Sequence, residues 1–216
     1  MSRFAGFPLA GLDFYEDLEA DNSKAFWTAH KDVYDSAVRA PMAALIAELE
    51  ADFGPAKIFR PYRDVRFAKD KTPYKDHQGA VVHAAPGAGW YVQIGAPGLY
   101  VAAGIYSASP DQLARLRATI DDEVRGHELE KILADVAAAG YTVGGDKLKT
   151  QPKGYSADHP RIELLRHKSL VVSREFGAPD WLPTARAATE IRKSWEAMRP
   201  VMEWIAAVTT GLQGRD

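Results

Sequence analysis

The sequence predicts an α+β fold, a central antiparallel or mixed sheet flanked by N-terminal, middle and C-terminal helices. Apolar residues recur at helical spacing near both ends of the chain and alternate at strand spacing in its middle. Ala96-Pro97-Gly98 separates two of the alternating stretches and is typical of a hairpin turn. The 216 residues contain no internal repeat or linker. We therefore expect a single globular domain over residues 1–216.

The first fifty residues are expected to be helical. Apolar side chains between residues 12 and 18 share one helix face, and Asn22 or Ser23 can cap a second helix. Pro41 either starts a third helix or kinks the second one. Gly54-Pro55 ends this helical region because neither residue continues a helix well.

The middle of the chain is expected to form the sheet, because side chains of alternating polarity suit a half-buried strand. The strands are expected at residues 59–67, 79–84, 90–95 and 99–106.

Helices return after the sheet. Ser109 at an N-cap position and Gln112 three residues later form a capping box, and an apolar stripe follows over residues 113–136. Residues 168–176 alternate again and predict a late strand, and the apolar spacing over residues 183–212 predicts a last helix.

Composition excludes several classes of protein. The chain has no cysteine, which excludes disulfides, thiolate catalysis, cysteine-bound zinc and iron–sulfur clusters. It shows no targeting segment and no apolar run of about 18 residues, so we expect a cytoplasmic protein without a membrane partner. The net charge of −2 argues against binding of extended nucleic acid.

The charge is unevenly distributed along the chain. Residues 57–77, the first basic segment, hold seven Lys or Arg and three Asp. Residues 147–168, the second basic segment, hold six Lys or Arg and two acidic residues. Each segment therefore has a net charge of +4, and the remaining residues together have −10. An acidic body thus contains two local concentrations of positive charge.

Both segments interleave cations with tyrosine and proline. Arginine presents a planar fork for phosphate or carboxylate, tyrosine adds a stacking face, and proline stiffens the backbone. We expect the segments to meet in one pocket for a small anionic ligand with a planar part, such as a nucleotide or phosphosugar. The expected ligand-binding residues are Arg60, Tyr62, Arg63, Arg66, Lys69, Lys71, Tyr74, Lys75, Lys153, Tyr155 and Arg161.

The same residues carry a family resemblance. Gly6-Phe-Pro, the stretch RPYRDVRFAKDKTPYK at residues 60–75 and PKGYSADHP at residues 152–160 are similar to the signatures of the domain-of-unknown-function 2461 family. The resemblance covers roughly residues 4–210. It implies that these charged and aromatic positions are characteristic of the family. It implies no activity, substrate or cofactor, and the cofactor is left open.

Catalysis is a further hypothesis. His159 and Asp64 are the candidate catalytic residues, and phosphoryl or phosphoester chemistry with His159 as acid or base is the expected class. Asp158 can orient the His159 ring, or either residue simply caps the following helix. Asp64 among cations can equally form a salt bridge. No metal-binding motif is present in the sequence.

Two alternatives to a ligand pocket remain. The chain is a noncatalytic interaction module that recognises an acidic partner segment, in which case we expect Trp195 or Trp204 to be exposed beside a flat basic face. Otherwise the basic motif builds the fold, and its arginines are buried and paired with carboxylates. The sequence leaves the oligomeric state open.

Overall fold

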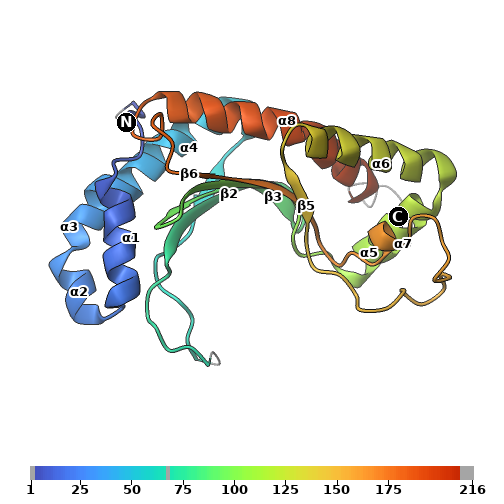
Figure 1. The fold of residues 1–216 in the computed structure, drawn as a ribbon, viewed down its shortest axis with the longest axis horizontal. Coiled ribbons are helices and arrows are strands. Elements are labelled where there is room, and N and C mark those ends of the chain that lie inside the picture. The colour runs from blue at the N-terminus through green and yellow to red at the C-terminus, as the bar shows by residue number, and fades with distance from the viewer. Residues whose placement is uncertain (1–2, 67–68, 210–216) are drawn as a thin grey trace, which may run out of the picture. The chain divides into compact units, whose positions relative to one another are not determined.

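The computed structural model describes residues 3–66 and 69–209. Six strands form one antiparallel sheet in the order β1-β2-β3-β4-β6-β5, which with its helices confirms the α+β class (Figure 1). The strands are β1 Ala56–Ile58, β2 His77–Ala85, β3 Ala88–Gly95, β4 Gly98–Ile105, β5 Thr142–Gly144 and β6 Leu170–Gly177. The helices are α1 Ala10–Ala20, α2 Lys24–Ala29, α3 Lys31–Val33, the π-helix η1 Tyr34–Arg39, α4 Ala40–Phe53, α5 Pro110–Asp121, α6 Glu123–Ala138, α7 Ile162–Leu165 and α8 Arg186–Thr209.

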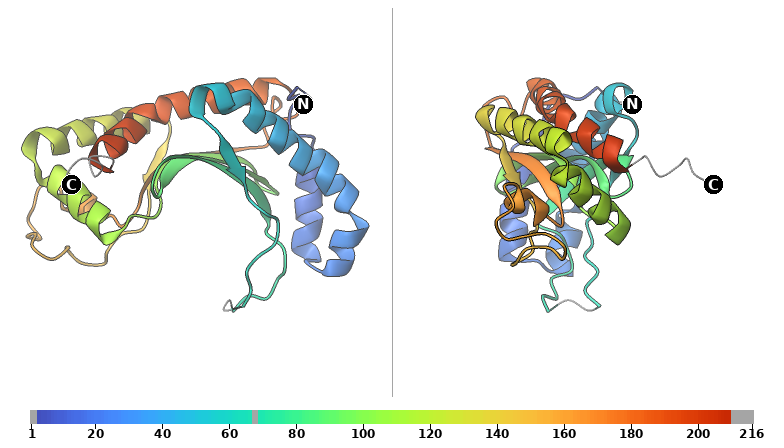
Figure 2. Two further views of the ribbon diagram at one scale, coloured as in Figure 1. Left: turned by 180° about the vertical axis from the view of Figure 1, so that it is seen from behind. Right: turned by 90° about the vertical axis from the view of Figure 1, so that its right-hand side faces the viewer.

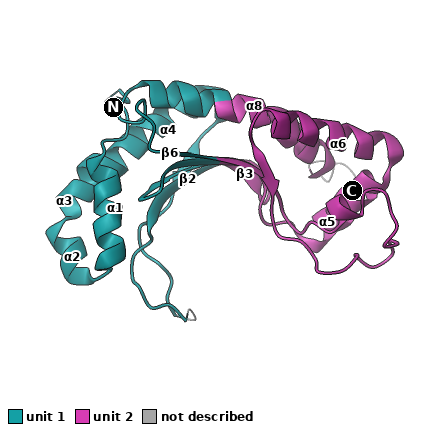
Figure 3. Ribbon diagram, in the orientation of Figure 1, with its two compact units in different colours: residues 1–82, 91–101, 175–193 teal, residues 83–90, 102–174, 194–216 magenta. Residues whose placement is uncertain are grey.

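The chain divides into two compact units (Figure 3). Unit 1 comprises residues 1–82, 91–101 and 175–193, and unit 2 comprises residues 83–90, 102–174 and 194–216. The first basic segment belongs to unit 1 and the second to unit 2. The organisation as one domain over residues 1–216 stays a prediction.

The N-terminal helices of unit 1 form as the sequence predicts. The apolar face of α1 is buried, and the Ser23 hydroxyl caps α2 by accepting a hydrogen bond from the Phe26 backbone N–H at 3.1 Å. Pro41 lies at the start of α4 but does not separate two helices, because α3, η1 and α4 follow one another directly. Gly54, with φ +95°, ends α4.

The sheet residues of unit 1 also match the expected pattern, with one exception. The strands expected at 79–84 and 90–95 lie within β2 and β3, and the hairpin between β3 and β4 turns at Ala96-Pro97. Gly98 has φ +98°, and a Cβ there would lie 2.1 Å from the Gly177 carbonyl oxygen, so only glycine fits.

The exception is the strand expected at residues 59–67, which is wrong. Residues 59–66 and 69–76 form two irregular legs that run side by side away from β1 and β2 (Figures 1 and 2). They pair with each other through Arg63 N–H to Pro73 O at 2.9 Å and Lys75 N–H to Pro61 O at 2.8 Å. The two prolines lack an N–H, so a regular ladder does not form. Phe67 lies outside the described residues.

Unit 2 contains the second helical region. The Ser109–Gln112 capping box at the start of α5 is confirmed in both of its hydrogen bonds. The late strand is confirmed as β6, whereas the short edge strand β5 was not predicted. Within this unit, Trp90 and Trp195 lie 6.1 Å apart between ring centroids. Helix α8 and strand β3 therefore contribute aromatic rings to the same core.

Helix α8 is confirmed over residues 186–209, while the expected end at Leu212 lies outside the described residues. Trp195 and Trp204 are both buried. Among residues 3–66 and 69–209, no helix has the length and apolar character needed to cross a membrane.

Candidate functional site

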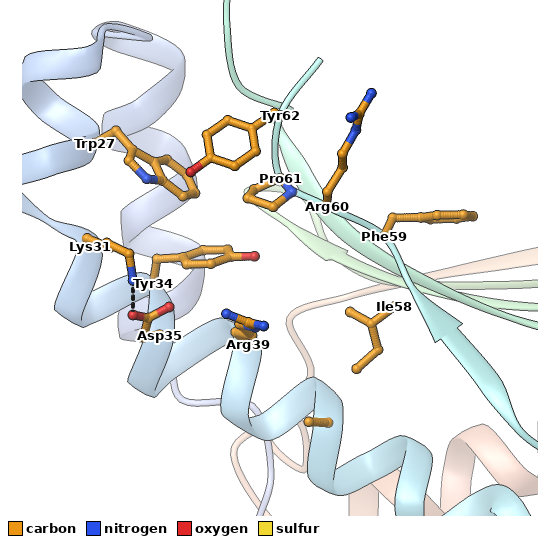
Figure 4. Close-up of a pocket in the computed structure, with 11 residues that line it drawn as sticks. Trp27, Lys31, Tyr34, Asp35, Arg39, Ile58, Phe59, Arg60, Pro61 and Tyr62 are labelled. Atoms are coloured by element: carbon orange, nitrogen blue, oxygen red, sulfur yellow. Dashed lines mark hydrogen bonds and ion pairs between the residues drawn. The ribbon is translucent and has the colours of Figure 1, made fainter. Parts of the chain in front are cut away.

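Unit 1 contains a cavity of about 460 Å³ between its helical wall and the chain that follows β1 (Figure 4). We call it the η1 cavity, because residues of the π-helix form much of its helical wall. Its lining consists of Trp27, Lys31, Tyr34, Asp35, Arg39, Ala43, Ile58, Phe59, Arg60, Pro61 and Tyr62. The volume lies within the range of small-molecule sites.

The π-helix shapes the helical wall. The Ala40 N–H donates to the Asp35 carbonyl, five residues back instead of four. Pro41 follows immediately, and its ring cannot donate a hydrogen bond and crowds the carbonyl four residues before it. A wider turn relieves this crowding. Because residues five apart in a π-helix lie nearly above one another, Tyr34 and Arg39 both face the cavity (Figure 4).

A buried hydrogen-bond network fixes the opposite wall. The Tyr34 hydroxyl donates to Gln78 Oε1 at 2.6 Å, and Gln78 Nε2 donates to the carbonyls of Phe59 at 2.8 Å and Gly79 at 2.9 Å. Burial raises the pKa of Tyr34 to about 12, so its hydroxyl stays a donor at neutral pH. Gln78 thereby holds the backbone at Phe59 against β2, and the residues after it are positioned beside η1.

Aromatic rings close one end of the cavity. Trp27 stacks on Tyr74 with ring centroids 4.2 Å apart and an interplanar angle of 5°. The Asn22 side chain holds the Tyr74 backbone in place. Asn22 Nδ2 donates to the Tyr74 carbonyl, and the Tyr74 N–H donates to Asn22 Oδ1, each at 3.1 Å. Tyr62 packs beside these rings but keeps 49% of its surface exposed. The Tyr62 ring is therefore a supported face on which a planar group can stack.

The charged side chains of the η1 cavity are incompletely paired. Lys31 contacts Asp35 Oδ2, but the other carboxylate oxygen, Oδ1, is buried without a hydrogen-bond partner among the described residues. Arg39 and Arg60 are exposed and form no ion pair or hydrogen bond with any described side chain. Figure 4 shows the Arg39 guanidinium in the gap between the two walls, whereas the Arg60 side chain points away from the helices.

Most of the other cations in the first basic segment contact acidic or backbone groups of the same segment. Arg66 donates to both carboxylate oxygens of Asp64, at 2.9 and 2.7 Å, and this contact lowers the pKa of Asp64. Arg63 pairs with Asp70, and Lys71 donates to the Val65 carbonyl at 2.9 Å. Asp64 is thus an ion-pair partner, which argues against a role as a general base.

Lys75 and Lys69 complete the first basic segment. The Lys75 ammonium lies 5.1 Å from the centre of the Phe59 ring, and burial together with the Arg60 charge lowers its pKa. Lys69 is exposed. Of the ligand-binding residues expected in this segment, Arg60 and Tyr62 line the η1 cavity, and Tyr74 lies directly behind Trp27.

The second basic segment uses its cations differently. Arg161 donates to the carbonyls of Ile120 at 2.7 Å and Asp121 at 3.0 Å, in the last turn of α5, and its side chain is only 11% exposed. Helix C-termini leave such carbonyls without backbone partners. Arg166 donates in the same way to Leu148 and Lys149, at 2.9 and 3.1 Å. These arginines act as backbone caps.

His159 is also held by protein groups. Its Nδ1 accepts from the Arg161 backbone N–H at 3.0 Å, which places the proton on Nε2, 2.9 Å from Asp121 Oδ1. The ring partner is therefore Asp121 and not the neighbouring Asp158. With both ring nitrogens engaged by protein groups, this arrangement argues against acid–base chemistry. His159 fixes the turn before α7, whose N-cap residue, Arg161, forms no side-chain cap.

The remaining expected residues of this segment lie nearby. The Tyr155 ring centroid is 6.2 Å from that of His159, and burial raises the pKa of Tyr155. Lys153 is exposed. Each basic segment is described within its own unit, and the expectation that both segments form one pocket stays a prediction.

The comparisons with known proteins agree with the motifs in the sequence. The model of the conserved hypothetical protein family DUF2461 matches residues 10–204. The chain belongs to this family. The search of curated proteins found no match.

Several cavity residues were not anticipated from the sequence. Asp35 and Arg39 lie outside both basic segments. Gln78, which supports the wall from behind without lining the cavity, directly follows the first segment. Pro41 within an apolar helical stripe was the available signal, because it indicates a disturbed turn just before it. Among the residues that the structure describes, no group of three or more His, Asp or Glu side chains is arranged to hold a metal ion.

Proposed function

We propose that this DUF2461 protein binds a small anionic ligand in the η1 cavity. Arg39, whose guanidinium lies between the two walls, pairs with the phosphate or carboxylate of the ligand, Arg60 adds positive charge beside it, and Tyr62 stacks on its planar part. The observation that carries the proposal is that both arginines line the cavity and form no ion pair or side-chain hydrogen bond with an acidic residue among those described. The chain has 29 acidic residues, so unpaired arginines at a cavity are unusual.

The cavity is also preorganised for such a ligand. The Tyr34–Gln78 network fixes the backbone at Phe59, and Asn22 fixes the backbone at Tyr74. A ligand therefore loses little affinity to ordering of the site. Phosphoryl or phosphoester chemistry at this cavity stays a prediction, and we propose no catalytic step.

The alternative, recognition of an acidic partner segment, has less support. It expected an exposed apolar stripe on the last helix, but Trp195 and Trp204 are buried. The interpretation of the basic motif as a buried ion-pair network also has less support, because Arg66 keeps 77% of its side chain exposed.

A thermal-shift experiment tests the proposal. Adenosine monophosphate, inorganic phosphate and citrate are each added to the wild type, to Arg39→Met and to Lys57→Met, a neighbouring cation outside the cavity. At a hundredfold excess over Kd, a bound probe is expected to raise Tm by roughly 5 to 10 °C. We expect this rise to disappear in Arg39→Met and to persist in Lys57→Met. No rise with any probe, or equal loss in both variants, would contradict the proposal.

A further inference from the structure

One carboxylate oxygen in the η1 cavity lacks a partner. Asp35 Oδ1 is buried and accepts no hydrogen bond from the described residues, while Oδ2 of the same side chain contacts Lys31. Asp35 lines the cavity together with Arg39, one helical turn further on. A residue that lines the cavity thus has an unused acceptor, which is closed to solvent although the Asp35 side chain as a whole is 41% exposed.

Such an oxygen calls for a physical reason. Buried polar atoms in proteins nearly always have partners, and Oδ1 has none even though its carboxylate is paired with Lys31 through Oδ2. Asp35 also belongs to a π-helical turn, a distortion that is frequent at functional sites. A hydrogen-bond donor on a bound ligand would satisfy Oδ1.

We infer that the ligand of the η1 cavity is a nucleoside monophosphate whose base carries an exocyclic amino group. The amino group donates to Asp35, the base stacks on Tyr62, and the phosphate pairs with Arg39. This inference rests on the proposed function and specifies its ligand. A cavity of about 460 Å³ with aromatic, cationic and acceptor groups provides one partner for each part of such a molecule.

Access to Asp35 requires one side chain to move. Oδ1 is closed to solvent and Lys31 contacts the other oxygen, so we infer that the Asp35 carboxylate turns toward the cavity when the Lys31 side chain leaves it. The Lys31 side chain is 55% exposed and sits on a flexible stem. Because exposed ion pairs of this kind contribute little to stability, this displacement costs little.

The expected consequence is selectivity for the amino group. Purine riboside 5′-monophosphate has a hydrogen atom where adenosine monophosphate has the amino group, and it leaves Asp35 unpaired. A hydrogen bond to a charged acceptor corresponds to a preference of about 10- to 100-fold.

Isothermal titration calorimetry with these two nucleotides tests the inference. We expect the wild type to prefer adenosine monophosphate by at least about 10-fold. Asp35→Ala should bind both nucleotides equally, with an unchanged affinity for purine riboside monophosphate that also shows that the variant is folded. Asp32→Ala, on the preceding helical turn and outside the cavity, is the matched control and should keep the preference.

The outcomes separate the inference from the proposed function. Equal wild-type affinity for the two nucleotides, with binding still lost in Arg39→Met, overturns the amino-group inference and leaves anion binding intact. A preference that survives in Asp35→Ala also overturns it. If neither nucleotide nor inorganic phosphate binds the wild type, both the inference and the proposed function fail.

Discussion

The two basic segments have the same net charge and similar composition, yet their cations have different partners. In the second basic segment, Arg161 and Arg166 donate to backbone carbonyls and are largely buried, and Arg166 also pairs with Glu163 at 2.7 Å. In the first, Arg66 pairs with an exposed carboxylate, and Arg60 forms no ion pair or hydrogen bond with any described side chain. The arginines of the second segment therefore stabilise the fold, whereas Arg60 in the first segment remains available to bind an anion.

The difference follows from the backbone around each segment. The end of α5 presents carbonyls that need donors, and a guanidinium with five N–H groups can satisfy several at once. The two legs of the first segment instead pair with each other through Arg63 and Lys75 N–H groups. Their arginine side chains are not needed as caps. A basic motif thus indicates a ligand site only where its side-chain N–H groups are not already hydrogen-bonded to backbone carbonyls.

The largest expected effect tests the structural segment. Arg161→Ala leaves the Ile120 and Asp121 carbonyls without their donor, and we expect the free energy of unfolding to fall by about 2–4 kcal/mol in urea titrations. Lys153→Ala, in the same segment but exposed, should not change it measurably. Equal stability of the two variants would show that Arg161 is not a cap.

A smaller effect is expected at the wall of the η1 cavity. Tyr34→Phe removes the hydroxyl that donates to Gln78 and leaves Oε1 unpaired. The free energy of unfolding should fall by about 1–2 kcal/mol, measured by the same titration. Thr28→Val, which removes a hydroxyl bonded only to its own helix, is the control. An unchanged stability in Tyr34→Phe would show that the Tyr34–Gln78 hydrogen bond does not hold the cavity wall in place.

The two segments should also lose stability in different pH ranges. Burial lowers the pKa of His167 from its ordinary 6.5, so the native state favours the neutral ring. This contribution is complete above pH 6.5 and is lost as the pH falls through the lower native pKa. Asp64 and Asp70 have pKa values that are lowered from 3.8, so their contribution to stability is lost only in stronger acid.

Urea titrations between pH 5 and 7.5 measure this difference. One proton limits the His167 effect to a slope of about 1.4 kcal/mol per pH unit. His167→Asn keeps a donor for the Ser169 carbonyl and should flatten the profile in this range. A profile as steep in His167→Asn as in the wild type would assign the titration to another group.

The smallest effect is expected at the exposed pair of the first segment. Arg66→Ala breaks the contact with Asp64, but 77% of the Arg66 side chain is exposed, so solvent replaces the lost partner. The urea midpoint should not move measurably. A clear decrease would show that the first segment, like the second, is held together by its charges.

Local signals in the sequence predicted much of the fold. The caps at Ser23 and Ser109 and the turn at Ala96-Pro97 depend on neighbouring residues alone, and the structure confirms them. The strand expected at 59–67 was wrong because alternation of charge in two proline-containing legs resembles a half-buried strand. Edge strands β1 and β5, three residues each, are too short to show a period.

The candidate site was predictable in part. Arg60 and Tyr62 follow from the basic motif and line the η1 cavity. Arg39 and Asp35 do not follow from it, because they lie outside both basic segments. Tyr34 and Arg39 are five residues apart, and the wider turn of the π-helix lets both face the cavity. The use of Arg161 as a cap depends on α5, some forty residues away in sequence. Sequence spacing contains no information about such contacts.

The central claim is that the ligand belongs to the first basic segment and not to both. The most direct test compares the Tm increase caused by adenosine monophosphate in the wild type, Arg60→Met and Lys153→Met, each of which removes one exposed cation. The account predicts a strongly reduced increase in Arg60→Met and a wild-type increase in Lys153→Met. An equal reduction in both variants would contradict it and would favour one pocket built from both segments.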